Sequence, residues 1–202
     1  AFPENFEYGN DAVETVSYDP EGAKVLLEES GWKDTDGDGY ADKDGEKLTI
    51  NWLTYPSRLE QPKLAEYAQA TLKEIGIDVV INNTPDHRTF AENGDFDLYV
   101  SSVTAAPTGD PEYFFTSTVT GSKNYGKYEN EEVTALTEKL HQTFETEERA
   151  ELAVELQQKI LDDDAFFFVS HLNMGIVTRS NVKGMAAHPC DYYEITADLE
   201  VE

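Results

Sequence analysis

The sequence predicts an α/β domain with a mixed sheet and helices on the faces of that sheet. Apolar residues alternate along several short segments, and they recur every three or four residues along several longer ones. Short turns join the two kinds of segment, which is typical of α/β folds. With 202 residues and 39% hydrophobic content, the chain is long enough to bury a substantial core, so we expect a single domain.

The first half of the chain predicts a strand, helix, strand unit. Residues 1–18 form an extended lead-in, and Asp19 and Pro20 then start a helix that ends at Gly31. Its predicted inward residues are Ala23, Leu26 and Leu27. A strand over residues 46–55 places Leu48, Ile50 and Trp52 on one face, a helix follows over 59–75, and a strand covers 77–81. The short connections favour a parallel pair of strands crossed by the helix.

The second half predicts one more strand and then mostly helix. A helical turn near residues 87–92 precedes a strand over 95–103, and Asp110 with Pro111 caps another short helix. Two helices follow over residues 130–144 and 146–162, the second with Thr146 as its cap. Their predicted inward residues are Val133, Leu136, Leu140, Leu152, Leu156 and Ile160. A long apolar strand over 165–178 and a tail of turns, with a strand near 192–196, complete the chain.

The composition disfavours several classes of partner. The chain carries 15 Lys and Arg residues against 41 Asp and Glu residues, a formal net charge of −26. This charge repels phosphate backbones and anionic lipid heads, so we expect no nucleic-acid partner. We interpret the acidity as a solvated surface. The sequence has no run of about 18 apolar residues and no secretory pattern at its start, so any targeting segment would lie upstream. The single cysteine, Cys190, is interpreted as a structural thiol in a loop.

No arrangement of residues typical of catalysis is found, so we expect a binding protein and not an enzyme. The four histidines (His87, His141, His171 and His188) are scattered, and the sequence contains neither an HExxH nor a GxSxG pattern. His171, beside Ser170 in an apolar segment, either lines a cleft or is a hydrogen-bonded core histidine. The aromatic run 166–168 is interpreted as core. The tyrosines near Gly126 combine an apolar ring with a polar tip, which suits a ligand surface.

The strongest local motif is the acidic loop DTDGDGYAD. Its oxygen ligands stand at positions 1, 3, 5, 7 and 9 of an EF-hand-like loop, with glycine at position 6. These candidate calcium ligands are Asp34, Asp36, Asp38, Tyr40 (through its carbonyl group) and Asp42. Position 12, which would supply the closing ligand, is Gly45. Two interpretations therefore stay open: a weak structural calcium site, or a turn rich in Asx hydrogen bonds.

An ordered set of segments resembles the carboxy-terminal half of the family 5 solute-binding proteins, the receptors for oligopeptides, dipeptides and nickel. The segments are YDPEGAKVLLEESGWKDTDGDG, LKEIGIDVVI, GDFDLYV, GDPEYFF, NEEVTAL, EERAELAVELQQKILDDDAFFFVSH and SNVKGM. The resemblance implies a periplasmic-binding-protein-like lobe that serves an ABC permease in the membrane. Residues 1–202 would then be the second lobe of a two-lobed clamp, with residues 180–202 crossing back to the amino-terminal lobe. A signal sequence and a lipid-anchor cysteine would lie upstream, giving an extracytoplasmic location.

The resemblance also implies a ligand wall over residues 101–113, which includes the end of the predicted strand over 95–103 and the loop that follows it. Peptide receptors usually have an aspartate where this sequence has Pro107, whereas Ala105-Ala106-Pro107 is similar to the Gly-Ala-Pro of nickel receptors. However, Thr104 and Thr108 replace the aromatic residues that flank that motif, and no histidine occurs over 116–128. The predicted solute is a nickel chelate or an oligopeptide. The candidate ligand-binding residues are Ser101, Ser102, Thr104, Ala105, Ala106, Thr108, Asp110, Tyr113, Tyr125 and His171.

Two functions from other classes are the alternatives. The acidic loop suggests a calcium-dependent extracellular adhesion or carbohydrate-associated module. The abundance of carboxylates suggests a hydrolase, although no acid and base pair stands out. For the solute-receptor interpretation, half of a clamp should bind its solute poorly, so we expect little affinity in the isolated chain.

Overall fold

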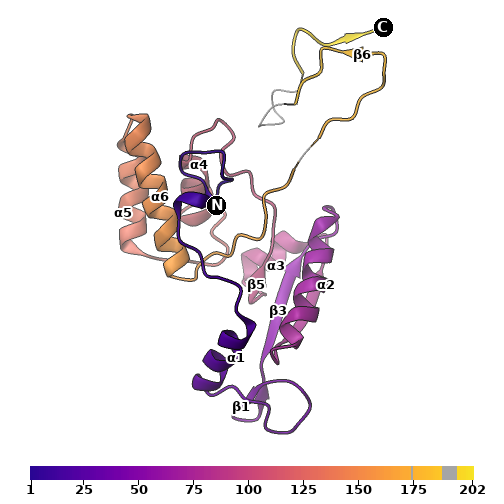
Figure 1. Cartoon of the computed structure of the whole chain (residues 1–202), viewed down its shortest axis with the longest axis vertical. Helices are drawn as coiled ribbons and strands as arrows, with labels where there is room; N and C mark the ends of the chain where they lie inside the picture. Colours follow the sequence, from indigo (N-terminus) through magenta and orange to yellow (C-terminus); the bar gives the residue numbers. More distant parts are fainter. Residues whose placement is uncertain (174, 188–194) are drawn as a thin grey trace. The chain divides into compact units, whose positions relative to one another are not determined.

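The structure is a computed structural model that describes residues 1–173, 175–187 and 195–202 (Figure 1). Its residues group into two compact units, one of residues 16–103 and the other of residues 1–15 with 104–202. The boundary between the two units falls after residue 15, within the lead-in that the sequence predicts over residues 1–18. The expectation that residues 1–202 form a single domain stays a prediction. No helix in the described part of the chain is both long and apolar enough to cross a bilayer.

The unit of residues 16–103 is built on a parallel three-stranded sheet. Its strands are β3 (Thr49–Thr54), β4 (Asp78–Asn83) and β5 (Leu98–Tyr99), in the order β4-β3-β5. The predicted parallel pair is therefore confirmed as β3 and β4. This sheet is parallel throughout instead of mixed. The antiparallel pairs of the described residues, β1 (Asp42–Lys43) with β2 (Glu46–Lys47) and β6 (Val182–Lys183) with β7 (Glu200–Val201), lie outside it.

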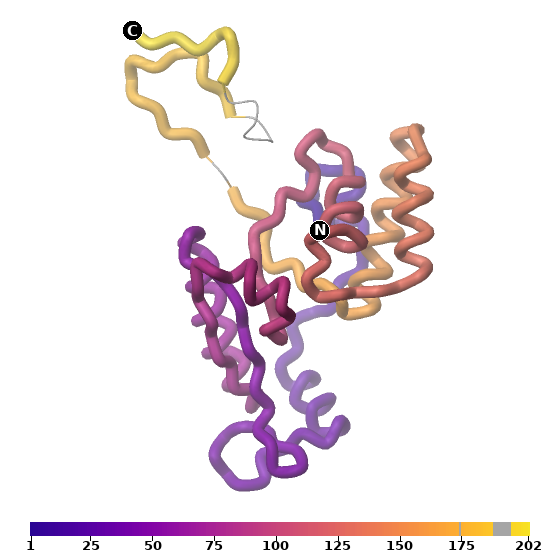
Figure 2. Tube along the Cα trace, turned by 180° about the vertical axis from the view of Figure 1, so that it is seen from behind, coloured from indigo at the N-terminus to yellow at the C-terminus, as the bar shows by residue number. Residues whose placement is uncertain are grey.

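Helices pack on both faces of this sheet. Successive residues of a strand point to opposite sides, so β3 contacts a different helix on each face. Trp52 packs in a cluster with Ala65 of α2 (Glu60–Lys73), and Leu48 and Ile50 join the same cluster as predicted. On the other face, the ring of Tyr55 stacks on His87 at the start of α3 (His87–Asn93), with the ring centroids 4.1 Å apart. Figures 1 and 2 show α2 running along the sheet.

Helix α1 (Pro20–Glu29) begins as the sequence predicts. The N–H group of Gly22 donates to the Asp19 carboxylate at 2.9 Å, and Gly31, with a φ of +89°, ends the helix. One predicted inward residue is wrong, because Leu26 is 65% exposed while Leu27 packs against the sheet cluster.

The strand predicted over residues 95–103 is much shorter in the structure, since only Leu98 and Tyr99 pair as β5. Backbone hydrogen bonds to β3 are made by the N–H groups of Asp97 and Val100, and side chains add a contact at each end. The Asn51 N–H donates to the Asp97 carboxylate at 2.7 Å, and the Ser102 N–H donates to the Tyr55 hydroxyl at 3.0 Å. The chain therefore leaves the sheet where the predicted ligand wall begins.

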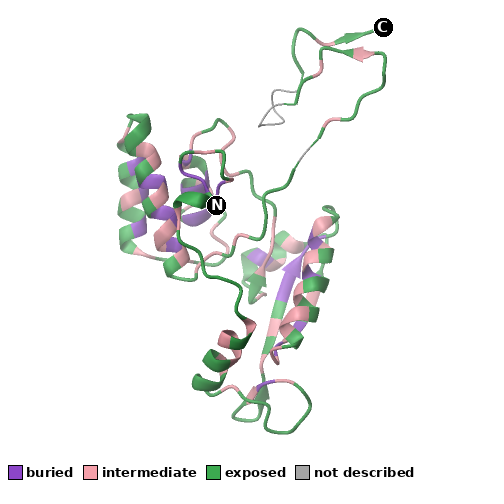
Figure 3. Ribbon diagram, in the orientation of Figure 1, coloured by how far each residue is buried: buried purple, intermediate pink, exposed green. Residues whose placement is uncertain are grey.

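The second unit has an aromatic and aliphatic core between helices. Its helical elements are η1 (Asn10–Ala12), α4 (Glu112–Phe114), the π-helix η2 (Phe115–Val119), α5 (Glu131–Gln142) and α6 (Thr146–Asp162). Figure 3 shows the buried stripes of α5 and α6. Most of the predicted inward residues of α5 and α6 are fully buried, and Leu136 is partly buried.

The sequence did not predict that the start of the chain belongs to this core. Phe2 is 0% exposed, and its ring makes edge contacts with Tyr8, Phe114 and Phe115. The fully buried Gln157 of α6 donates to the carbonyl group of Tyr8 at 2.8 Å, which ties the first residues to the helix. The first residues of the chain are thus packed against the helices of this unit.

Three further expectations are wrong in this unit. Thr146 is the first residue of α6 and not its cap, which is Glu145. The residues described within 165–178 form no strand, because no neighbouring strand pairs with them. Of the predicted core run, Phe166 and Phe168 pack on the core but Phe167 is 84% exposed. Cys190, His188 and most of the strand expected near 192–196 lie outside the described residues.

Candidate functional site

The predicted ligand wall, residues 101–113, lies mostly at the surface of the structure. Ser102, Thr104 and Thr108 are exposed, Val103 is 42% exposed, and only Pro111 is buried. Ser101, Ala105 and Ala106 are half-buried. Residues 101–103 belong to the sheet unit, and residues 104–113 belong to the helical unit. The hydroxyl groups of the wall are therefore accessible within each unit.

The wall contains a turn at Gly109. Its φ of +78° is one that residues with a Cβ rarely adopt, and its N–H donates to the Ala106 carbonyl at 3.1 Å. The Tyr8 hydroxyl donates to the Gly109 carbonyl at 2.6 Å, and burial raises the pKa of Tyr8 to about 12, so this hydroxyl stays protonated. The Tyr8 hydroxyl therefore keeps this hydrogen bond to the turn over the ordinary pH range.

Arg149 of α6 is the centre of a charged network next to this turn. Its guanidinium group donates to both carboxylate oxygens of Asp110, at 2.7 and 2.8 Å, and to Glu112 at 2.9 Å. It also donates to the carbonyl groups of Leu140 and Thr143, each at 2.6 Å, where α5 ends. Arg149 therefore satisfies the last carbonyls of α5 and fixes Asp110 and Glu112 within the wall.

The network shifts the pKa values of its members in consistent directions. Partial burial alone would raise the pKa of Asp110, but hydrogen bonds from Arg149 and from the Glu112 N–H hold it below its ordinary value. A 2.6 Å contact with His141 lowers the pKa of Glu112, and the same contact raises the pKa of His141. Asp110, a predicted ligand residue, thus has an observed structural partner, and its contact with a solute stays a prediction.

The other candidate ligand residues differ in their surroundings. Tyr113 is 40% exposed, and its hydroxyl accepts a hydrogen bond from Lys123 Nζ at 3.1 Å. Tyr125 is half-buried. His171 is exposed and lies outside any strand, so the interpretation as a core histidine is wrong. Its role at a ligand surface stays a prediction.

A group of polar and aromatic residues that the sequence did not single out lies at the carboxyl end of β3. Thr54 and Gln61 are 0% and 3% exposed, and the Gln61 amide donates to the Ser102 hydroxyl at 3.0 Å. The Tyr55 hydroxyl accepts from the Ser102 N–H, and His87 Nδ1 lies 2.7 Å from the Tyr99 hydroxyl. Ligands of parallel α/β sheets bind at the carboxyl ends of strands, so the position itself indicated this group.

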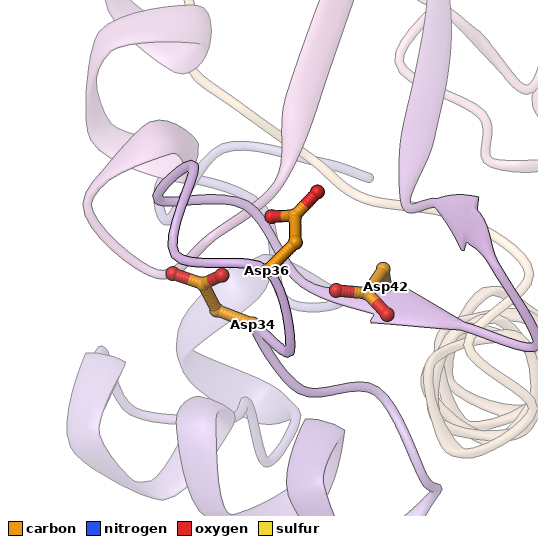
Figure 4. A group of neighbouring side chains, drawn as sticks. All are labelled: Asp34, Asp36 and Asp42. Carbon is orange, nitrogen blue, oxygen red and sulfur yellow. The ribbon is translucent and has the colours of Figure 1, made fainter.

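The acidic loop brings together three of its five candidate calcium ligands. One carboxylate oxygen from each of Asp34, Asp36 and Asp42 lies within 4.8 Å of the others (Figure 4). The Asp38 carboxylate instead lies 3.5 Å from Lys47 Nζ, and Tyr40 lies under the same ammonium group at 4.2 Å. Three carboxylates suit the preference of calcium for hard oxygen ligands.

The Asx interpretation of the loop also has direct support. The N–H groups of Gly37 and Gly39 donate to the Asp34 carboxylate at 2.7 and 3.0 Å. Asp42 accepts from the hydroxyl and the N–H of Thr35, and these bonds lower its pKa. The loop is therefore organised by its own hydrogen bonds, and calcium binding stays a prediction.

Comparison with known proteins gives relatives of one kind. The chain is 29% identical over 200 residues to the oligopeptide-binding protein AppA of Bacillus subtilis, covering 96% of this chain and 37% of that protein. The solved structure of AppA with a nonapeptide matches 95% of this chain and 39% of its own, with 28% identity and a TM-score of 0.78. The nickel-binding protein NikA of Staphylococcus aureus is 26% identical over 185 residues, covering 90% of this chain and 36% of that protein.

A nickel ABC transporter structure from Bacillus halodurans matches 81% of this chain and 34% of its own, with 29% identity and a TM-score of 0.69. The chain thus spans well under half of each of these relatives, which are binding and transport proteins and not enzymes. None of them supports an adhesion module. The family model described as bacterial extracellular solute-binding proteins, family 5 Middle, matches residues 1–126. Since that is more than half of the sequence, the chain belongs to the bacterial extracellular solute-binding proteins of family 5, which act outside the cytoplasm.

Proposed function

We propose that this chain supplies one wall of the ligand cleft in the solute-binding component of an ABC importer, and that the solute is nickel carried as a chelate or an oligopeptide. Membership of family 5 supports the receptor role. The relatives named above bind oligopeptides or nickel, which supports these two solutes. The partners in this proposal are an amino-terminal lobe of the same protein and a membrane permease, with a lipid anchor at a cysteine upstream.

The observation that carries the choice of a nickel chelate is the chemistry of residues 101–113. The carboxylates in this stretch are Asp110 and Glu112, and both are bound by Arg149. A free carboxylate that could pair with the α-amine of a peptide is therefore missing from this stretch. It also contains no histidine or cysteine to bind nickel directly. Exposed hydroxyl groups can instead donate hydrogen bonds to the carboxylates of an organic chelator.

The oligopeptide is the second candidate because of the similarity to AppA. That similarity extends over 96% of this chain, and the structural match has a TM-score of 0.78. In a peptide complex, the backbone carbonyl groups and the terminal carboxylate of the peptide would accept hydrogen bonds from the same hydroxyl groups.

The segment of residues 166–173 supports the presence of a second lobe. Phe166 and Phe168 pack on the core, while Phe167, Val169 and Leu172 are 84%, 41% and 50% exposed. Among the described residues, no backbone group of this segment is hydrogen-bonded to another backbone group. An extended apolar segment with unpaired N–H and C=O groups is a template for strand pairing. We assign its pairing partner to the amino-terminal lobe.

The proposal is tested on the full-length receptor. Native mass spectrometry of the purified receptor should detect a bound nickel chelate or a peptide, and calorimetry should then measure its dissociation constant. Suitable probes are a nonapeptide, as bound to AppA, and Ni(L-His)2, as bound to NikA. The isolated chain should bind either probe far more weakly, because half of the cleft is missing. A full-length receptor that binds neither probe would overturn the proposed solutes. A micromolar or tighter constant in the isolated chain would overturn the division of the cleft between lobes.

A further inference from the structure

A buried polar network holds Ser102 at the point where the chain leaves the sheet. The side chain of Gln61, at the start of α2, is 3% exposed and donates from Nε2 to the Ser102 hydroxyl oxygen at 3.0 Å. Thr54, at the end of β3, is 0% exposed, and its hydroxyl lies 3.4 Å from Gln61 Oε1. Burying an amide without hydrogen-bond partners costs free energy, so the Gln61 side chain is held in the orientation that makes these two contacts.

The backbone of Ser102 is held separately by Tyr55. The Ser102 N–H donates to the Tyr55 hydroxyl at 3.0 Å. Tyr55 is 7% exposed, and its ring stacks on His87, which keeps the hydroxyl in place. Ser102 is thus fixed by one bond to its backbone and one to its side chain, although the residue is exposed.

In this network the Ser102 hydroxyl accepts a hydrogen bond and keeps its own proton free to donate. A serine hydroxyl has one proton to donate and two lone pairs to accept with. Gln61 Nε2 is a donor, so it uses a lone pair of Ser102 and leaves the hydroxyl proton free for another acceptor. We infer that Gln61 and Tyr55 are positioning residues, which hold Ser102 so that its hydroxyl donates a hydrogen bond to an acceptor oxygen of the solute, such as a carboxylate oxygen.

This inference rests on the proposed function, because it treats Ser102 as part of the ligand wall. Both probes named above carry carboxylate oxygens, so both can test it. The experiment uses the full-length receptor with the variants Ser102→Ala and Gln61→Met and with the double variant. Calorimetry measures the dissociation constant for Ni(L-His)2 and for the nonapeptide, and a thermal melt of each variant measures its stability.

Ser102→Ala should weaken binding about 10-fold, the usual effect of losing one hydrogen bond to a charged group. Gln61→Met should weaken binding to a similar extent, since the freed hydroxyl can turn its proton to other acceptors. In the Ser102→Ala background, Gln61→Met should have no further effect on binding. It should lower the melting temperature when Ser102 is present, because it breaks their hydrogen bond, but not in the Ser102→Ala background, where the Gln61 amide has already lost that partner. A Gln61 with only a structural role would weaken binding equally in both backgrounds, and that additivity would overturn the inference.

The role of Tyr55 is tested without any solute. Tyr55→Phe removes only the hydroxyl that accepts from Ser102, so hydrogen exchange at the Ser102 amide should become faster in the ligand-free receptor. The matched control is Tyr67→Phe, because Tyr67 is 72% exposed and its hydroxyl has no hydrogen bond among the described residues. Unchanged exchange in Tyr55→Phe would overturn the positioning role. A wild-type receptor that binds neither probe would overturn the proposed solutes instead, and the exchange measurement would still decide the positioning.

Discussion

Replacing Arg149 with methionine tests the central interaction of the helical unit. Methionine keeps much of the length and apolar volume of the arginine stem but removes every hydrogen bond of the guanidinium group. The side chain of Arg149 is only 13% exposed, and it donates to two carboxylates and two helix-terminal carbonyl groups. The substitution therefore leaves Asp110 without a cationic partner and Glu112 with His141 alone.

The expected loss of stability is about 2–3 kcal/mol. Removing one partner of a fully buried ion pair costs roughly 3–5 kcal/mol, because the other charge is left uncompensated. The side chains of Asp110 and Glu112 are 41% and 25% exposed, so water can hydrate them and the cost falls below that range. The carbonyl groups of Leu140 and Thr143 lose their donor as well, which adds about 1 kcal/mol or less for each bond.

Urea unfolding followed by circular dichroism measures this loss in the free energy of unfolding. Arg149→Lys should fall between the wild type and Arg149→Met, because an ammonium group keeps the charge but cannot make the bidentate contact. The matched control is Arg58→Met, since the exposed Arg58 side chain makes no ion pair among the described residues. If Arg149→Met and Arg58→Met changed the free energy of unfolding equally, the reasoning about the network would be refuted.

Three further predictions follow from the burial, pKa and loop observations. Leu156→Ala should lower the free energy of unfolding by about 2–5 kcal/mol, because Leu156 is 0% exposed. Phe144→Ala should have little effect, because Phe144 is 88% exposed. Equal effects of the two substitutions in urea unfolding would contradict the assignment of Leu156 to the core. The pKa of Glu112 is lowered from 4.5 and that of His141 is raised from 6.5, so their pair stabilises the fold between about pH 4.5 and 6.5. Its contribution should be lost as the pH falls through the folded pKa of Glu112 or rises through that of His141. In unfolding curves measured across pH, His141→Gln should remove the loss at higher pH, whereas the loss at lower pH should only become smaller, because Arg149 still lowers the pKa of Glu112. Saturating calcium should raise the melting temperature of the wild-type chain but not that of Asp36→Ala. If the wild-type melting temperature did not rise, the calcium interpretation would fail and the loop would be stabilised by its own hydrogen bonds alone.

Local patterns in the sequence predicted most of the secondary structure. The cap at Asp19, the stop at Gly31 and the parallel pair of β3 and β4 are all found where the sequence places them. These features depend on residues close together in the chain, which is why spacing and composition indicate them. The ordered set of segments also identified the family, which the family model confirms.

The candidate site was predicted only in part. The ligand wall predicted over residues 101–113 is mostly exposed, and three of the five candidate aspartate-loop ligands converge. The sequence did not reveal the partner of Asp110, which lies 39 residues away on α6. It likewise did not show that Gln61 reaches Ser102 across 41 residues of sequence. A polar residue in the first turn of a helix gives no signal of what its side chain will contact.

The sequence alone therefore determined the α/β class, most of the helices and the family. Tertiary structure decided which polar groups are paired, which apolar residues are buried and where the strands stop. Strand pairing is a property of neighbours, so the apolar segment after α6 forms no strand without a partner. Burial is likewise a property of the assembled unit, so Phe2 became core and Leu26 stayed exposed.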